Sequence, residues 1–247
     1  PVIYANSIDE GTQSTIESYS PDLGVVVAYG ALLPQQTLDT PTHGWINLHF
    51  STLPAWRGAA PVQWQILSGS TTAGSSVFSL VKELDAGDVY NSVEYPIDPD
   101  ETGGDLLQRL SVAGADQVIS VVTAIEEGSA VLQAQSGEAT YARKLQLEDG
   151  HLLLASSSQQ VYNQFRGITP EPGAFVLLDD ERLKILEARL GDIRDLPVGH
   201  IRSVEKKLYL GCSDGSLELR RIQPFGKQSM SAMDWFRGLR QDEVVVS

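Results

Sequence analysis

The chain has 247 residues, which is long enough for two hydrophobic cores, and its 42% hydrophobic content is ordinary for a globular protein. It contains no apolar run near the roughly eighteen residues of a membrane span, and its first residues lack the basic and apolar regions of a secretory signal, so we expect a cytoplasmic protein with no membrane partner. Its single cysteine, Cys212, excludes an internal disulfide and a cysteine-based zinc site.

The net charge of −14 is distributed unevenly. Residues 1–143 carry four Lys and Arg against seventeen Asp and Glu, whereas residues 144–247 carry fourteen against fifteen. Phosphate binding depends on a basic surface, so the acidic first part is expected to repel polyanions, and the second part has enough cations to bind one locally. The charge pattern therefore predicts two regions with different partners.

The first part of the chain alternates strand-like and helical patterns. The apolar run between Gly24 and Gly30 is typical of a central parallel strand covered on both faces. Thr102 and Asp105 form a capping-box pattern that predicts the start of a long helix packed on the sheet. The pattern as a whole predicts an α/β fold with a doubly wound, mainly parallel sheet. The expected strands are residues 24–30, 45–50, 75–80 and 89–95, and the expected helices are residues 35–38, 61–67 and 102–128.

The second part of the chain has a different pattern. A short helix is expected at Gln159–Arg166, and short strands follow Pro172 at a spacing typical of a small β-barrel, the OB-fold being one candidate. We expect a catalytic domain over residues 1–140, a linker over 141–150 and a β domain over 151–247. The turn signals between the expected strands are Asp179-Asp180, Pro197-Val198-Gly199 and Asp214-Gly215.

The strand at residues 45–50 carries two polar side chains that suit catalysis. Strand side chains repeat with period two, so Asn47 and His49 are expected to point to the same face. The strand ends in a loop with two prolines and a glycine before the helix that begins near Pro61. Ligands of open α/β sheets bind at the carboxyl ends of strands, so this pair lies where chemistry is expected.

Three residue types in this region would suit acyl or formyl transfer to an amine. The reaction needs a group that stabilises a tetrahedral oxyanion, a base that takes the amine proton, and an ion that orients or charges that base. Asn47, His49 and Asp85 supply these groups. On spacing alone, a structural histidine, a backbone-satisfying asparagine and a turn-forming aspartate remain the more frequent alternatives.

A longer stretch extends these three residues. Residues 46–63 have the sequence Ile-Asn-Leu-His-Phe-Ser-Thr-Leu-Pro-Ala-Trp-Arg-Gly-Ala-Ala-Pro-Val-Gln, and Leu-Asp-Ala-Gly-Asp follows at residues 84–88. This closely resembles the methionyl-tRNA formyltransferases, a family of folate-dependent formyltransferases. The wider group of folate-dependent formyltransferases shares the Asn, His and Asp, whereas the stretch Trp-Arg-Gly-Ala-Ala-Pro resembles the tRNA-directed family. Further similar motifs at residues 26–30, 141–145, 166–170, 223–227 and 235–238 extend the resemblance over essentially the whole chain.

The resemblance implies a Rossmann-like catalytic domain followed by an OB-like domain that binds tRNA. The formyl donor would be 10-formyltetrahydrofolate, with no metal, and the acceptor would be the α-amino group of methionine on initiator tRNA. Asn47 would hold the oxyanion and His49 would transfer protons. Asp85 would orient the imidazole and favour its charged form. The chain is expected to be a monomer.

The resemblance also assigns binding residues. The folate loop would consist of Ser51, Thr52, Leu53 and Pro54, where Thr52 replaces the leucine usual in the family. The family's opening strand, helix and basic loop have no counterpart before Pro1, so we expect an N-terminally incomplete catalytic domain. The expected tRNA contacts are Arg57, Lys227, Arg237 and Arg240.

Two alternative functions remain open at this point. One is a related folate-dependent formyltransferase or hydrolase that uses the same three residues on an amino sugar or releases formate. The other is a tRNA-binding remnant that is inactive because its N-terminal segment is missing. The second domain discriminates against the first alternative, because a sugar or purine enzyme would not need cations on a β module.

Overall fold

The computed structural model describes residues 2–247, which form two compact units. The first unit contains the residues up to Pro61, then Thr72–Pro96 and Gln108–Lys144. The second contains Val62–Thr71, Ile97–Leu107 and Leu145–Ser247. The chain therefore contributes two short segments of its first half to the second unit, which a division at a single linker does not anticipate.

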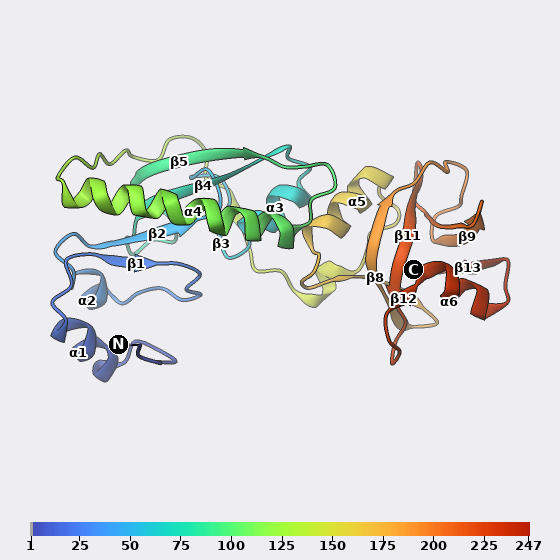
Figure 1. Cartoon of the computed structure of the whole chain (residues 1–247), viewed down its shortest axis with the longest axis horizontal. Helices are drawn as coiled ribbons and strands as arrows, with labels where there is room; N and C mark the ends of the chain where they lie inside the picture. Colours follow the sequence, from blue (N-terminus) through green and yellow to red (C-terminus); the bar gives the residue numbers. More distant parts are fainter. Residues whose placement is uncertain (1) are drawn as a thin grey trace. The chain divides into compact units, whose positions relative to one another are not determined.

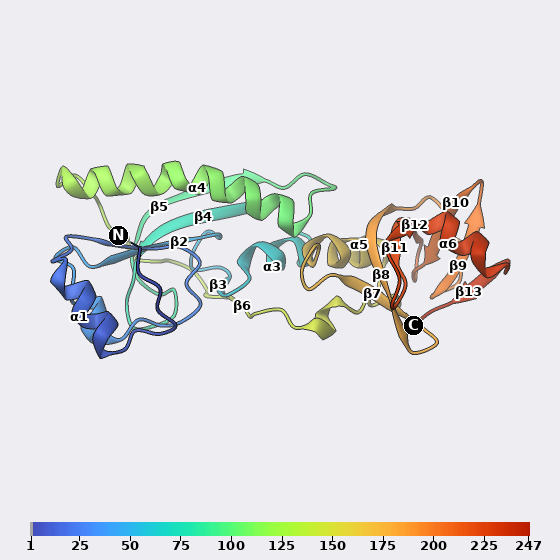
Figure 2. The ribbon, with the colours of Figure 1, turned by 60° about the horizontal axis from the view of Figure 1, so that its bottom comes forward.

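The first unit is built on a four-stranded sheet with the order β1-β2-β4-β5. The long helix α4 runs along this sheet over β2, β4 and β5 in both views (Figures 1 and 2). The α/β architecture, the paired strands and the long helix are confirmed. The strands are β1 (Gly24–Val26), β2 (Trp45–His49), β4 (Thr72–Ser79) and β5 (Val89–Pro96), and the helix is α4 (Gly103–Glu126).

The strand directions differ from the expectation of a mainly parallel sheet. Among the described strands, β1 and β2 are parallel, whereas β2 pairs with β4 and β4 with β5 in antiparallel fashion. The loop between β4 and β5, residues 80–88, is shorter than the crossover of a dozen or more residues that parallel neighbours need. The short acidic turn therefore forces β5 to return antiparallel.

The strand expected at residues 24–30 is shorter in the structure. β1 ends at Val26, Ala28 takes a φ of 55°, and β1 lies at the end of the described sheet. Val25 and Val27 are 45% and 53% exposed. The apolar side chains of this run are therefore not covered on both faces.

Close packing fixes α4 against the sheet. Gly114 has no side chain at the point where the helix meets Leu48, and a Cβ there would lie 2.5 Å from a Leu48 methyl carbon. Gln117 is buried on the same helix, and its amide accepts from the Ser75 hydroxyl and donates to the Asn91 carbonyl. The apolar contact and these hydrogen bonds hold the strand that carries Asn47 and His49 under the helix.

Shorter elements complete the first unit. The helix α1 was not predicted, although Asp9 caps it by accepting from the Thr12 N–H at 2.8 Å, as N-cap aspartates do. β3 and β6 pair in parallel, so Tyr141 and Ala142 belong to a sheet rather than to a free linker. The elements are α1 (Glu10–Ser18), α2 (Gln35–Leu38), β3 (Arg57–Gly58) and β6 (Tyr141–Ala142).

The second unit is a curled antiparallel sheet with the order β13-β9-β10-β11-β8-β7, and β12 pairs with β11. Ser247 follows β13 and exchanges two backbone hydrogen bonds with Leu177 of β7, which joins the two edges of the sheet. The predicted small β domain is confirmed. Its strands are β7 (Ala174–Leu178), β8 (Glu181–Leu190), β9 (His200–Val204), β10 (Lys207–Gly211), β11 (Ser216–Gln223), β12 (Met230–Ser231) and β13 (Glu243–Val245).

Helices pack inside and beside this sheet. The core combines inward strand residues such as Val176 and Leu208 with Tyr162 and Trp235 from two helices. Asp179 and Asp180 both take positive φ in the turn between β7 and β8, which confirms the turn predicted there. The helical elements of this unit are α3 (Pro61–Leu67), η1 (Leu147–Gly150), α5 (Ser158–Gly167) and α6 (Ala232–Leu239).

A polar cluster explains why residues 97–107 belong to the second unit. The Tyr162 hydroxyl of α5 donates to Asp100 at 2.6 Å, and Arg189 of β8 pairs with the same carboxylate. The buried guanidinium of Arg166 donates to the carbonyls of Asp98 and Glu101 and to the Asn163 side chain. These bonds fasten the segment before α4 to α5 and β8.

No helix among the described residues combines the length and apolar character that a membrane crossing requires.

Candidate active site

β2 places Asn47 and His49 side by side. In the register of the sheet, Asn47 lies between Val26 of β1 and Phe78 of β4, and His49 lies opposite Ser76. The two side chains share one face because strand residues alternate. The Asn47 side chain is half-buried, and its amide makes no hydrogen bond to the described residues. Its N–H groups are therefore free to bind a ligand.

His49 is 5% exposed and is held on two sides. Its ring meets Phe78 edge to face with centroids 6.3 Å apart, and Nε2 lies 2.8 Å from the Trp56 carbonyl oxygen. A carbonyl oxygen only accepts, so Nε2 carries the hydrogen in this contact. In the neutral ring the lone pair is then on Nδ1, which lies 3.7 Å from Asp85 Oδ2. Nδ1 is therefore the ring atom that can take a proton.

Burial and charge act on the His49 imidazole in opposite directions. Burial lowers its pKa, and this effect outweighs the raising effects of the Asp85 charge and of the hydrogen bond to Trp56. The pKa therefore lies below its ordinary value of 6.5. Asp85 acts in the expected direction, since its charge favours the imidazolium, but burial has the larger effect and favours the neutral ring.

The backbone around Asp85 brings its carboxylate to the ring. Asp85 takes a φ of 48°, and its Oδ2 accepts the Gly58 N–H at 2.7 Å. Gly58 itself has a φ of 116°, and a Cβ there would lie 2.7 Å from the Ala142 carbonyl oxygen. Only glycine fits this position without strain. The carboxylate is thus oriented by a backbone N–H that a side chain at residue 58 would displace.

Ser76 of β4 fixes the backbone of the loop after β2. The Ser76 hydroxyl donates to the Ser51 carbonyl at 2.7 Å and accepts the Leu53 N–H at 3.2 Å. Ser51 is fully buried, and its hydroxyl donates to the Ala55 carbonyl. Thr52, Leu53 and Pro54 are each half-buried. The loop therefore has a fixed backbone and partly accessible side chains next to β2.

The sequence analysis did not predict Gln135 as a site residue. Gln135 donates from Nε2 to the carbonyls of Asp85 and Gly87, both at 2.8 Å, and accepts from Arg57. It lies in a polar stretch without periodicity, 48 to 78 positions from its partners, so no local pattern indicates it. The same contact shows that the Arg57 guanidinium, expected to meet tRNA, is bound inside the first unit.

The other expected tRNA contacts lie on the second unit. Lys227 is exposed in the turn between β11 and β12, where its N–H donates to the Pro224 carbonyl. Arg237 is exposed on α6 and pairs with Asp234 at 3.2 Å. Arg240 follows α6 in the left-handed conformation and is exposed. Of these three side chains, only that of Arg237 forms an ion pair among the described residues.

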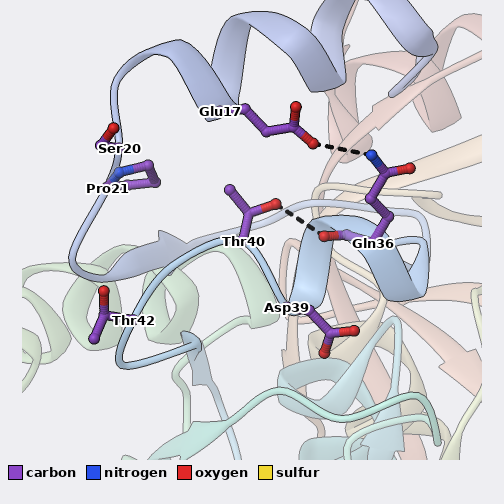
Figure 3. Close-up of a pocket in the computed structure, with 7 residues that line it drawn as sticks. All are labelled: Glu17, Ser20, Pro21, Gln36, Asp39, Thr40 and Thr42. Atoms are coloured by element: carbon purple, nitrogen blue, oxygen red, sulfur yellow. Dashed lines mark hydrogen bonds between the residues drawn. The ribbon is translucent and has the colours of Figure 1, made fainter.

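A surface hollow of about 410 Å³ lies elsewhere in the first unit (Figure 3). Glu17 reaches from α1 across this hollow to accept from the Gln36 amide of α2 at 2.9 Å. The carboxylates of Glu17 and Asp39, which line the hollow, would repel the anionic groups of folate and tRNA. Among the described residues, no group of three or more His, Cys, Asp or Glu is placed to hold a metal ion. The lining residues are Glu17, Ser20, Pro21, Gln36, Asp39, Thr40 and Thr42.

Comparison with protein families covers most of the chain. The family described as "Formyl transferase" matches residues 4–122, and the one described as "Formyl transferase, C-terminal domain" matches residues 144–240. The methionyl-tRNA formyltransferase of Paenarthrobacter aurescens is 44% identical over 246 residues, which are 99% of this chain and 80% of the relative. The methionyl-tRNA formyltransferase of Leifsonia xyli is 46% identical over 244 residues, or 99% and 81%.

Solved structures share the fold at lower identity. The methionyl-tRNA formyltransferase from Clostridium thermocellum superimposes with a TM-score of 0.62 at 19% identity, covering 76% of this chain and 80% of that one. HypX from Aquifex aeolicus, solved in complex with tetrahydrofolic acid, has a TM-score of 0.72 at 16% identity and covers 91% and 40%. These similarities confirm the expected fold class.

The balance at His49 predicts the effect of Asp85→Asn. Removing the carboxylate charge removes a raising effect, so the His49 pKa should fall further below its wild-type value. Proton NMR titration measures this, with His49→Ala identifying the resonance among the four histidines. Asp88→Asn, an exposed change in the same turn, should leave the His49 titration unchanged. An unchanged or raised His49 pKa in Asp85→Asn would contradict the assignment.

Proposed function

The chain belongs to the methionyl-tRNA formyltransferase family, and from this premise we propose that it transfers the formyl group of 10-formyltetrahydrofolate to the α-amino group of methionine on initiator tRNA. The observation that carries this proposal is the identity of 44% and 46% to two methionyl-tRNA formyltransferases over 99% of the chain. The same observation favours the tRNA-directed function over a sugar formyltransferase or a hydrolase. All three expected catalytic residues are present in one unit.

The reaction exchanges one carbon–nitrogen bond for another. The methionine amine attacks the formyl carbon, and the carbonyl oxygen becomes an oxyanion in a tetrahedral intermediate. The bond from this carbon to the folate nitrogen then breaks. The amine loses one proton and the folate nitrogen gains one, so a single group that accepts and then donates a proton serves both steps. The products are the formylated amine and tetrahydrofolate.

The geometry supports a role for each of the three side chains. The Asn47 amide has N–H groups free for a ligand and stands on the same face as His49, so it donates to the oxyanion. His49 Nδ1 accepts the proton of the attacking amine and returns it to the leaving nitrogen. A base with a lowered pKa is already unprotonated at pH 7, and Asp85 stabilises the imidazolium that forms between the two transfers.

The folate donor is assigned to the loop of Ser51, Thr52, Leu53 and Pro54. Family members use a formyltetrahydrofolate co-substrate. The loop leaves β2 just after His49, and Ser76 fixes its backbone, which suits a surface that positions a flat ring system. The Thr52 hydroxyl occupies the place of the leucine usual in the family and replaces part of an apolar contact.

The tRNA partner is assigned to exposed cations of the second unit. Residues 1–143 carry four Lys and Arg against seventeen Asp and Glu, whereas residues 144–247 carry fourteen against fifteen. Lys227 and Arg240 are exposed, and the structure describes no ion pair for either side chain. Such cations can neutralise phosphates without first breaking a salt bridge.

Asn47→Ala and His49→Ala test the catalytic assignment. Each should lower turnover by about two or more orders of magnitude, because Asn47→Ala removes oxyanion stabilisation and His49→Ala removes proton transfer, and both act on the same step. The double variant should cost little more than either single one. Rapid-quench measurement of formylmethionyl-tRNA checks this, and His43→Ala, an exposed histidine just before β2, is the matched control. Fully additive losses, or near-normal turnover in either single variant, would refute the mechanism.

Lys227→Ala tests the tRNA surface. If Lys227 meets a phosphate, binding should weaken and the slope of log affinity against log salt should flatten by about one unit, while turnover at saturating tRNA stays nearly unchanged. Filter binding at several salt concentrations measures the slope. Lys207→Ala is the matched control, because Lys207 is paired with Glu218 at 3.4 Å and should change the slope less. An unaltered slope in Lys227→Ala would exclude a phosphate contact at this residue.

A further inference from the structure

The segment of residues 133–142 connects the two loops that carry the site. At its start, the backbones of Gln133 and Val89 exchange two hydrogen bonds. At its end, the Thr140 carbonyl accepts the Arg57 N–H at 2.8 Å, and the Ala142 carbonyl accepts the Ala60 N–H at 3.2 Å. The segment is therefore bonded both to the strand after the Asp85 loop and to the loop that follows His49.

Gln135, in the middle of this segment, is bonded on both sides through its side chain. Its Oε1 accepts from Nε and Nη2 of Arg57, which comes from β3. Its Nε2 donates to the carbonyls of Asp85 and Gly87, each at 2.8 Å. A guanidinium only donates and a carbonyl only accepts, so these partners permit one orientation of the amide. Arg57 therefore determines which end of Gln135 faces the Asp85 loop.

The two carbonyls that Gln135 binds lie in a backbone that has little other freedom. Asp85 is in the left-handed region at a φ of 48°, a conformation that is uncommon for residues other than glycine, although aspartate adopts it more readily than most. A Cβ at Gly87 would lie 1.7 Å from the Ser79 carbonyl oxygen, so the turn passes directly against β4. The bonds from Gln135 hold the turn at Asp85 and Gly87, and the position of the Asp85 carboxylate follows from that of its backbone.

We propose that Gln135 is a positioning residue for formyl transfer, which holds the Asp85 loop so that its carboxylate faces Nδ1 of His49, and that Arg57 orients the Gln135 amide for this task. The proposal rests on the proposed function for its kinetic readout and extends it to two side chains. It also gives Arg57 a role within the first unit in place of the tRNA contact that the sequence predicts.

The surroundings of His49 explain how a displaced loop would be detected. The ring is packed against Phe78 of β4 and the carbonyl of Trp56, and the charge that acts on it comes from Asp85. Gln135 is hydrogen-bonded to the Asp85 carbonyl, and the Arg57 guanidinium is in turn hydrogen-bonded to Gln135. Moving Asp85 away from the ring weakens the raising effect of its charge, so the His49 pKa falls.

The decisive comparison is Gln135→Met in two backgrounds. In the otherwise wild-type chain, loss of the Gln135 hydrogen bonds to Arg57, Asp85 and Gly87 should lower kcat by about tenfold or more. A displacement of a catalytic group near 1 Å lowers the rate by up to about two orders of magnitude. In the Asp85→Asn background the same change should lower kcat less than about twofold, because the residue acts through Asp85. Gln133→Met, an exposed change two residues away, is the matched control and should leave kcat unchanged.

The His49 titration gives a readout that does not depend on activity. Gln135→Met should lower the His49 pKa toward its value in Asp85→Asn, and Gln133→Met should not. Equal kcat losses in both backgrounds, a loss below twofold in the wild-type background, or an unchanged His49 pKa would overturn the proposal. If the wild-type chain forms no formylmethionyl-tRNA, the proposed function fails, and the titration still decides whether Gln135 positions Asp85.

Arg57→Ala separates the two roles of this arginine. A positioning role predicts a lower kcat with an unchanged KM for tRNA and an unchanged salt slope, since the guanidinium lies on Gln135. A higher KM for tRNA with a flatter salt slope and unchanged kcat would overturn the assignment of Arg57 and return it to the tRNA contacts.

Discussion

The chemistry of the first unit depends on the balance between burial and charge at one imidazole. Removal from water favours the neutral ring of His49, the Trp56 carbonyl keeps the hydrogen on Nε2, and Asp85 lies 3.7 Å from the nitrogen that is left as the base. A neutral base is what an attacking amine requires, and a nearby carboxylate is what the resulting imidazolium requires. In the proposed mechanism, the same two residues therefore serve the states before and after proton transfer, provided that their distance is maintained.

Backbone constraints maintain that distance. Gly58 presents its N–H to the Asp85 carboxylate from a conformation that favours glycine, and Gly87 lets the turn pass against β4. The segment with Gln135 joins these parts to the loop after β2. The site is thus assembled from β2 and three connecting segments around it, while α4 holds β2 from the other side. Rigid strands position the reacting groups, and hydrogen-bonded loops set their orientation.

Local periodicity predicted the elements that carry the site. The alternation at residues 45–50 placed Asn47 and His49 on one face, and the limits of α3 and α2 agree with the expected helices. The strand at residues 24–30 is shorter than predicted, because an apolar run does not show where the backbone leaves the extended conformation, here before Ala28 at a φ of 55°. Gln135 was missed, and the Arg57 contact with it was not anticipated, because side-chain bonds between residues fifty or more positions apart leave no trace in local pattern. The assignment of Val62–Thr71 to the second unit was not predicted for the same reason, because it depends on contacts between residues distant in the sequence.

The fate of an isotope-labelled formyl group tests the central claim most directly. The chain would be mixed with formyl-labelled 10-formyltetrahydrofolate and methionyl initiator tRNA, and the products would be separated and identified by mass spectrometry. The account predicts that the label appears in an amide bond on the methionine amine, with one tetrahydrofolate released for each group transferred. Label recovered as free formate, or transferred to an amino-sugar nucleotide in a parallel reaction while the tRNA stays unlabelled, would contradict it.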